Sequence, residues 1–118
     1  MKFLFTGKNT TVSDAMRERA EKKIGKYAKI FRPDTETHVT FTLEKGRNRA
    51  EVTISSKGLF IRAEETTEDM YSSIDRVTEK LERQIRKYKT KLGKRIHQDA
   101  MVSENFSIEE PVFEEEDL

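Results

Sequence analysis

The first quarter of the chain changes from a strand pattern to a helix pattern. Residues 2–7 (KFLFTG) place two phenylalanines two positions apart and end on a glycine, which predicts a short strand. From Ser13 onward, apolar residues recur every three or four positions, the spacing of one helix face. Ser13 suits the N-cap, and Pro33 should end the helix near Ile30 or Phe31. The predicted apolar face consists of Met16, Ala20, Ile24, Tyr27 and Phe31.

The middle of the chain predicts three consecutive strands. Apolar and polar residues alternate over residues 38–44, 49–55 and 59–64, and this period of two gives each strand one buried face. The segments between them, residues 45–48 (KGRN) and 57–58 (KG), are turn sequences. Adjacent strands should therefore pair as antiparallel hairpins, and the polar face of the resulting sheet should be open.

A second, longer helix follows the strands. Apolar residues step by three or four positions from Met70 to Leu92, and no glycine or proline interrupts them before Gly93. Thr66 and Thr67 are candidate caps, with Glu68 and Asp69 in the first turn. A coiled coil is the alternative for such a stripe, but about three heptads beside three apolar-faced strands favour packing on a sheet.

The predicted order is thus β-α-β-β-β-α, an α+β sandwich in which two helices pack on one face of a four-stranded sheet. The α-β-β-β-α order of a double-stranded RNA-binding module is contained within it. An RRM-like reader fits less well, because it needs a different order and several aromatic residues on the open face, where only Phe60 qualifies.

Composition divides the 118 residues into a basic body and an acidic tail. Residues 98–118 hold eight acidic residues and no lysine or arginine, a charge of −8, and too few apolar residues to order a backbone. The 23 basic and 14 remaining acidic residues give residues 1–97 a charge of +9. We therefore expect one folded domain over 1–97 and a disordered or conditionally ordered tail or linker over 98–118, with a polyanion as partner.

Candidate catalytic and metal-binding groups are scarce. The chain has no cysteine, and its two histidines, His38 and His97, have no neighbouring nucleophile in the sequence. It also lacks a glycine-rich phosphate loop and the spaced ligands of a calcium loop. No apolar run approaches the length of a membrane span. These patterns predict a protein that is not an enzyme and needs no cofactor or metal.

Basic residues gather on one side of each predicted helix. In the second helix they fall in a sector about 80° wide and about 27 Å long, opposite the apolar stripe. The acidic Asp75, Glu79 and Glu82 lie on the other flank, so this sector is expected to be a row of cations without paired carboxylates. The C-terminal basic row is Arg76, Lys80, Arg83, Lys87, Lys91 and Lys94, and the N-terminal basic row is Arg19, Lys22, Lys26 and Lys29.

Such rows have two interpretations. Charged helix faces commonly serve only to keep a small domain soluble. Rigid rows of lysine and arginine at turn spacing can instead contact successive phosphates, gaining affinity by counterion release with little reading of bases. Two separate rows favour the second interpretation, with structured RNA as the partner.

The sequence also resembles a known family. Residues 63–75 (AEETTEDMYSSID), residues 80–85 (KLERQI) and Gly7-Lys8-Asn9 closely resemble the bacterial ribosome hibernation promoting factor family, also called ribosome-associated inhibitor or ribosome subunit interface proteins. The resemblance covers essentially residues 1–97, and the β-α-β-β-β-α fold of that family agrees with the predicted order.

The resemblance implies a cytoplasmic, non-catalytic translation inhibitor of the stress response and stationary phase. Members bind the small ribosomal subunit between its head and body, where messenger and transfer RNA would lie. They contact ribosomal RNA (rRNA) through basic side chains on the helices. No membrane or small-molecule partner is implied. In this sequence those contacts map to Lys80, Arg83, Lys87 and Lys91, with Lys22, Lys26 and Lys29 as the companion set.

The end of the chain departs from the longer family members. Those continue through an acidic linker into a second domain that dimerises and pairs ribosomes, whereas this chain stops within its acidic segment. It is either a short form or a fragment of a long one, and the segment around Pro111 favours the fragment. Without the second domain, we do not expect it to form homodimers. The competing hypothesis is a protein-interaction module in which the tail, anchored by Phe106 and Phe113, binds a basic partner.

Overall fold

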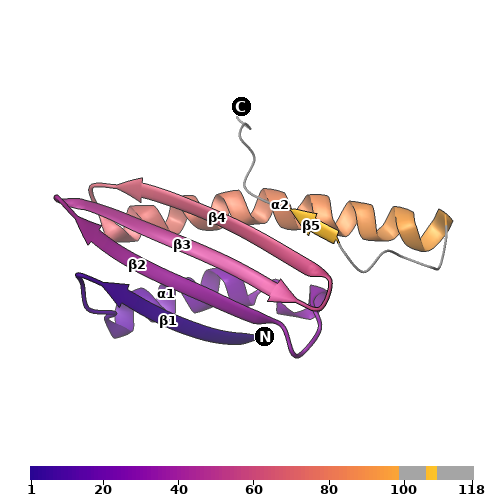
Figure 1. Ribbon diagram of the computed structural model, residues 1–118, viewed down its shortest axis with the longest axis horizontal. Coiled ribbons are helices and arrows are strands. Elements are labelled where there is room, and N and C mark those ends of the chain that lie inside the picture. Colours follow the sequence, from indigo (N-terminus) through magenta and orange to yellow (C-terminus); the bar gives the residue numbers. More distant parts are fainter. Residues whose placement is uncertain (99–105, 109–118) are drawn as a thin grey trace.

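The computed structural model describes residues 1–98 and 106–108, and the side chains of residues 1–90. Figure 1 shows a twisted sheet with two helices lying along it. The elements in chain order are β1 (Lys2–Lys8), α1 (Asp14–Gly25), the short 3₁₀ helix η1 (Ala28–Ile30), β2 (Glu36–Glu44), β3 (Arg47–Ser56), β4 (Leu59–Thr67), α2 (Met70–Gln98) and β5 (Phe106–Ile108).

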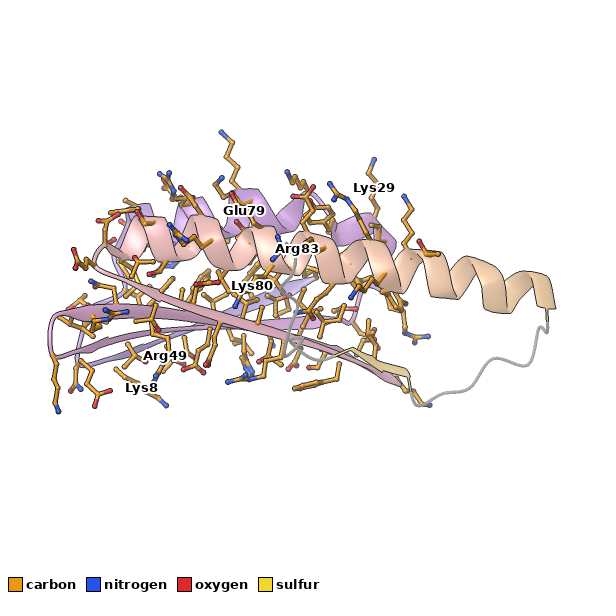
Figure 2. The ribbon with its side chains drawn as sticks, turned by 90° about the horizontal axis from the view of Figure 1, so that it is seen from above. Lys8, Lys29, Arg49, Glu79, Lys80 and Arg83 are labelled. Atoms are coloured by element: carbon orange, nitrogen blue, oxygen red, sulfur yellow. The ribbon has the colours of Figure 1, made fainter. Side chains whose placement is uncertain are left out.

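The sheet has the strand order β1-β2-β3-β4-β5. Strand β1 runs parallel to β2, and α1 forms the crossover between them, while β2, β3 and β4 form an antiparallel meander. Figure 2 shows both helices on the same side of the sheet, so its other side is open. The predicted α+β sandwich, with two helices on one face of β1–β4, is therefore confirmed.

The hairpin between β2 and β3 turns within two residues. Lys45 and Gly46 have φ values of 53° and 76°, the left-handed values that a tight hairpin turn requires at both central positions. Glycine adopts this conformation without the steric penalty of a Cβ atom. The turn predicted over 45–48 is shorter than expected, because Arg47 and Asn48 already belong to β3.

Helix α1 begins where the sequence predicts and ends earlier. The Ser13 side chain accepts a hydrogen bond from the Met16 N–H at 3.1 Å, which confirms it as the N-cap. The helix ends at Gly25, not at Ile30 or Phe31, and η1 follows after a two-residue turn. Glycine has a low helix propensity, which favours the end of the helix at this position. The apolar spacing continues beyond Gly25 because the η1 segment also packs on the core.

The start of α2 also differs from the prediction. Thr66 and Thr67 are the last residues of β4, and the cap is Asp69, whose Oδ2 accepts a hydrogen bond from the Ser72 N–H at 2.9 Å. The Thr67 hydroxyl in turn accepts a hydrogen bond from the Asp69 N–H at 3.1 Å. The sequence offers three residues of capping types within four positions here, and the strand pairing of β4 decides between them.

The core lies between the sheet and the helices. Two polar side chains of α2 fix its position over the strands: the Ser73 hydroxyl donates to the Asn48 carbonyl oxygen at 2.6 Å, and the Gln84 amide donates to the Arg62 carbonyl oxygen at 3.0 Å. Within the described residues, no helix is long and apolar enough to cross a membrane. The largest buried apolar side chains are Phe41, Ile24, Ile54, Ile61, Ile74, Leu81 and Ile85.

The segment expected to be a disordered tail contains one described element. Residues Phe106–Ile108 form β5, which pairs in parallel with the edge of β4, with Leu59 opposite Phe106 and Ile61 opposite Ile108. These three residues are ordered in the structure, where they pair with the hydrogen-bonding groups of a sheet edge, as the conditionally ordered alternative allows. Residues 99–105 and 109–118 of the predicted tail lie outside the described part of the chain.

Candidate nucleic-acid interface

The outward side of α2 carries exposed cations. Arg76, Arg83 and Lys87 are all exposed, and they lie opposite the buried stripe of Ile74, Leu81 and Ile85. The three cations span about 16 Å along the axis at 1.5 Å per residue. Because the stripe beneath them is locked into the core, their Cα positions are fixed relative to one another. This part of the C-terminal basic row lies where the sequence predicts.

Lys80 does not point outward with its neighbours. Its Nζ lies 2.9 Å from Glu65 Oε2 and donates to the Glu64 carbonyl oxygen at 3.1 Å, so the side chain turns down onto β4. Only 25% of the side chain is exposed. Figure 2 shows Lys80 between α2 and the sheet, below Arg83. The expectation that this row lacks paired carboxylates is thus wrong at Lys80, because Glu65 reaches it from a strand.

The last two residues of the C-terminal basic row are only partly described. Lys91 and Lys94 lie within α2, which continues through Gly93 to Gln98. Their side chains lie outside the described residues. The backbone therefore keeps both residues on the same helix as Arg83 and Lys87, and their contacts remain a prediction.

Arg19 of the N-terminal basic row is held by a carboxylate. Its Nε and one terminal nitrogen donate to the two Asp75 carboxylate oxygens at 2.9 and 3.0 Å, and its guanidinium lies 5.5 Å from the centre of the Tyr71 ring. Lys23 adds a second contact to Asp75 at 3.5 Å. The hydrogen bonds from Arg19 are the main cause of the lowered pKa of Asp75, which burial opposes. Arg19 thus joins α1 to α2, and its charge is largely balanced.

The remaining residues of the N-terminal basic row are exposed but do not share one helix. Lys22 lies on α1, Lys26 follows its last residue, and Lys29 lies on η1. Lys26 Nζ is 5.3 Å from the centre of the Tyr27 ring. Figure 2 shows Lys29 pointing away from the sheet. The prediction of one continuous helical row is wrong beyond Gly25, although all three lysines keep exposed side chains.

Acidic residues of α2 separate the two basic rows. Asp75 contacts α1 through Arg19 and Lys23. Burial, and after it the negative charge of Glu82, raises the pKa of the Tyr27 phenol. Glu79 lies between these acids on the same flank by helical spacing. The helix surface therefore presents a cationic strip on α2, an acidic flank, and a second set of lysines beyond it.

The described residues offer little for chemistry other than charge. His38 is exposed on the open face of the sheet, and the His97 side chain is not described. Among the described residues, no three histidine or carboxylate side chains gather as a metal site would require. The exposed cations suit a phosphate backbone, because charge and spacing, and not base edges, determine that contact.

Sequence reasoning missed a further group of cations on the open face of the sheet. Lys8, Lys45, Arg47 and Arg49 gather at the end where β2 and β3 meet. Figure 2 shows Lys8 and Arg49 on the side of the sheet away from the helices. The alternation of polar and apolar residues in β3 could have predicted that Arg47 and Arg49 share its polar face. Only strand pairing brings Lys8 beside them.

Comparison with known proteins places the chain in a family. Residues 3–93 match the sequence profile described as Sigma 54 modulation protein / S30EA ribosomal protein. The chain belongs to this family. Curated relatives include two proteins named ribosome hibernation promotion factor: that of Lactococcus lactis subsp. cremoris (strain MG1363), 47% identical over 98 residues, and that of Staphylococcus aureus (strain COL), 41% identical over 98 residues.

The matched regions cover 80% of this chain and 53% and 52% of the two relatives. The chain therefore spans about half the length of the curated relatives it matches.

Solved structures of similar proteins confirm the fold. A ribosomal subunit interface protein from Coxiella burnetii has a TM-score of 0.66 at 30% identity, and the match covers 76% of this chain and 99% of that one. The N-terminal domain of Protein Y from Thermus thermophilus has a TM-score of 0.67 at 29% identity, covering 75% of this chain and 99% of that domain. The family fold is thus the domain formed by β1–β4 and the two helices.

Proposed function

We propose that this chain is a non-catalytic inhibitor of translation that binds the rRNA of the small ribosomal subunit. The observation that carries the proposal is the rigid set of exposed cations on α2, Arg76, Arg83 and Lys87, held outward by the buried stripe beneath them. Lys22, Lys26 and Lys29 provide a second set beyond the acidic flank. Phosphates of a folded RNA are the partners that such fixed cations match.

The names of the relatives support the ribosome as the particle concerned. Both curated relatives are called ribosome hibernation promotion factors, and one structural neighbour is called a ribosomal subunit interface protein. We infer that the chain binds in the decoding channel and keeps ribosomes inactive under stress. The site of action would then be the cytoplasm.

The mechanism requires occupancy and no reaction. A folded domain in the channel excludes messenger and transfer RNA by volume. Its cations contact phosphates of the channel RNA and release the counterions that those phosphates otherwise hold. If about six phosphates are contacted, the logarithm of the affinity should fall against the logarithm of the salt concentration with a slope of roughly −4 to −5.

Sedimentation with purified small subunits tests the proposal. The variant Arg76→Glu/Arg83→Glu reverses two exposed charges of α2. Lys2→Glu/Lys57→Glu is the matched control, with the same change in net charge at exposed sites in β1 and in the β3–β4 turn. The helix variant should lose most of its association and show a shallower salt slope, while the control should keep both. Equal sedimentation of the two variants would overturn the proposal.

A further inference from the structure

One end of the open sheet face carries a row of polar and cationic side chains that cross all four long strands. Strand register places Lys8 beside Thr42, Thr42 beside Arg49, and Arg49 beside Thr66. Adjacent strands lie about 4.8 Å apart, so the row is about 14 Å wide. The turn between β2 and β3 adds Lys45 at its margin.

The surface is hollowed at this end. A hollow of about 270 Å³ is lined by Thr42, Glu44, Lys45, Arg47, Arg49 and Thr66. Three of its lining residues are cations and one is a carboxylate. The Thr42 side chain is only 6% exposed, and its Oγ1 has no hydrogen-bond partner among the described residues.

The nearby carboxylates do not cancel this charge. Glu51, in the next row, is engaged by two arginines, with its oxygens 2.8 Å from Arg49 Nε and 3.5 Å from a terminal nitrogen of Arg62. Lys45 and Arg47 are exposed, and no ion pair with another described residue holds either of them. Glu44, the strand neighbour of Arg47, is the single acid in the lining.

We propose that this hollow binds a phosphate group of an RNA backbone. Lys45 and Arg47 would neutralise the phosphate charge, and the Thr66 hydroxyl would donate to one of its oxygens. The hollow is lined by no aromatic side chain on which a base could stack. A phosphate of the RNA backbone is therefore favoured over a base as the bound group.

The hollow lies on the face of the sheet opposite the helices (Figure 2). This inference rests on the proposed function and extends it: RNA contacts the domain on two opposite sides, through α2 on one and through the β2–β3 end of the sheet on the other. A domain held in this way lies between two RNA segments, instead of resting on a single surface.

Binding to small subunits at several salt concentrations tests the hollow. Lys45→Asn/Arg47→Gln removes two charges, and asparagine tolerates the positive φ of position 45. Lys2→Gln/Lys57→Gln, at the opposite end of the sheet, is the control. The first variant should bind about tenfold more weakly and lower the magnitude of the salt slope by about 1.5 to 2, with an unchanged unfolding temperature. The control should bind like the unaltered chain.

The two proposals fail in distinguishable ways. If Lys45→Asn/Arg47→Gln binds with unaltered affinity and slope while Arg76→Glu/Arg83→Glu loses binding, the hollow is not an RNA contact and the proposed function stands. If the unaltered chain does not bind small subunits, the proposed function fails. The NMR measurement described next then tests by itself whether the hollow binds RNA.

NMR of the full chain separates an RNA backbone from a free phosphate compound. The backbone amide signals of Thr42 and Thr66 are followed during addition of a short single-stranded RNA of random sequence, and in a second sample during addition of inorganic phosphate. The RNA should shift both signals at much lower concentration than phosphate does, and not in the Lys45→Asn/Arg47→Gln variant. Phosphate binding as tightly as RNA, or no shift with RNA, would contradict the proposal.

Discussion

Arg19 and Arg83 both lie on outer helix surfaces, and their surroundings give them different roles. The Arg19 guanidinium is bidentate with Asp75 and lies over Tyr71, so it joins two helices. Arg83 is exposed on the far side of α2 and has no described carboxylate partner. An arginine already engaged in this way has to give up existing contacts to bind a phosphate. An arginine without a carboxylate partner does not. Residues of one basic row therefore differ in what they offer to RNA.

Asp75→Asn tests the structural role of the Arg19 pair. The pKa of Asp75 is lowered chiefly by the hydrogen bonds from Arg19, so the folded protein keeps this carboxylate charged to lower pH than the unfolded chain does. The pair's contribution to stability is complete above about pH 4, the ordinary Asp value, and is lost as the pH falls through the folded pKa. The variant should be slightly less stable at pH 7 and should lose less stability on acidification. Urea unfolding at pH 7 and pH 3 measures both, and an unchanged pH dependence would refute the role.

Arg83→Gln should weaken binding and Lys80→Gln should weaken the fold. Arg83→Gln removes an exposed cation, so it should lower the magnitude of the salt slope for small-subunit binding by about 0.7 to 0.9 and leave stability unchanged. Lys80→Gln breaks the contact with Glu65 and should cost about 1 kcal/mol in the free energy of unfolding, with a smaller effect on binding. Filter binding and urea unfolding of both variants check this. A larger binding loss for Lys80→Gln would show that Lys80 leaves Glu65 to contact RNA.

The sequence could predict which helix sector holds the cations, and it could not predict their partners. The sector of Arg76, Arg83 and Lys87 follows from local spacing of 100° per residue. Glu65 and Asp75 reach Lys80 and Arg19 from other elements, and only packing brings those elements together. For the same reason the gathering of Lys8 with the cations of β3 was missed, since it depends on the parallel register of β1 and β2.

Elements follow from the sequence wherever periodicity and turn chemistry agree. The strands, the presence of a turn around Gly46 and the cap at Ser13 obey strong local rules, so they could be predicted, although the turn is shorter than the predicted 45–48. The end of α1 could not, because η1 continues to bury apolar residues after the helix has ended at Gly25. Strand β5 could not either, since three residues of an acidic segment pair with an edge that exists only in the folded sheet.

Gly46→Ala and Gly25→Ala should shift stability in opposite directions. A Cβ atom meets no heavy atom within 4 Å at either position, so backbone conformation decides the effect. Gly46 has a φ of 76°, and alanine there should cost about 1 to 2 kcal/mol. Gly25 has no positive φ and ends α1, so alanine should stabilise by about 0.4 to 1 kcal/mol. Thermal unfolding of both variants provides the comparison, and destabilisation by Gly25→Ala would contradict the description of α1.

At the scale of the whole molecule, charge is divided between a body of +9 and an acidic segment of −8. Strand β5, within that segment, is held against β4, the strand that Lys80 contacts from α2 (Figure 1). This attachment brings part of the acidic segment to the edge of the sheet beside α2. Attraction between the two charges should be strongest at low ionic strength.

Truncation after Gln98, the last residue of α2, tests the role of the acidic segment. We expect the truncated chain to keep its association with small subunits, because the cations of α2 remain. It should bind random RNA several-fold more tightly than the full chain at low salt, and equally at high salt. Loss of ribosome association would instead support the hypothesis that the segment itself binds the partner, and equal affinities at low salt would exclude a screening effect.

The orientation of α2 toward rRNA can be measured directly because the chain contains no cysteine. A single cysteine at the exposed Glu79 of α2, carrying a tethered iron chelate, would cleave RNA near that position in the complex with small subunits. A cysteine at Lys57, in the β3–β4 turn, is the comparison site. We predict cleavage of small-subunit rRNA along the decoding channel from position 79, with sedimentation confirming that the labelled chain is bound. A bound chain that produces no cleavage from position 79 would contradict the claim that α2 faces the RNA.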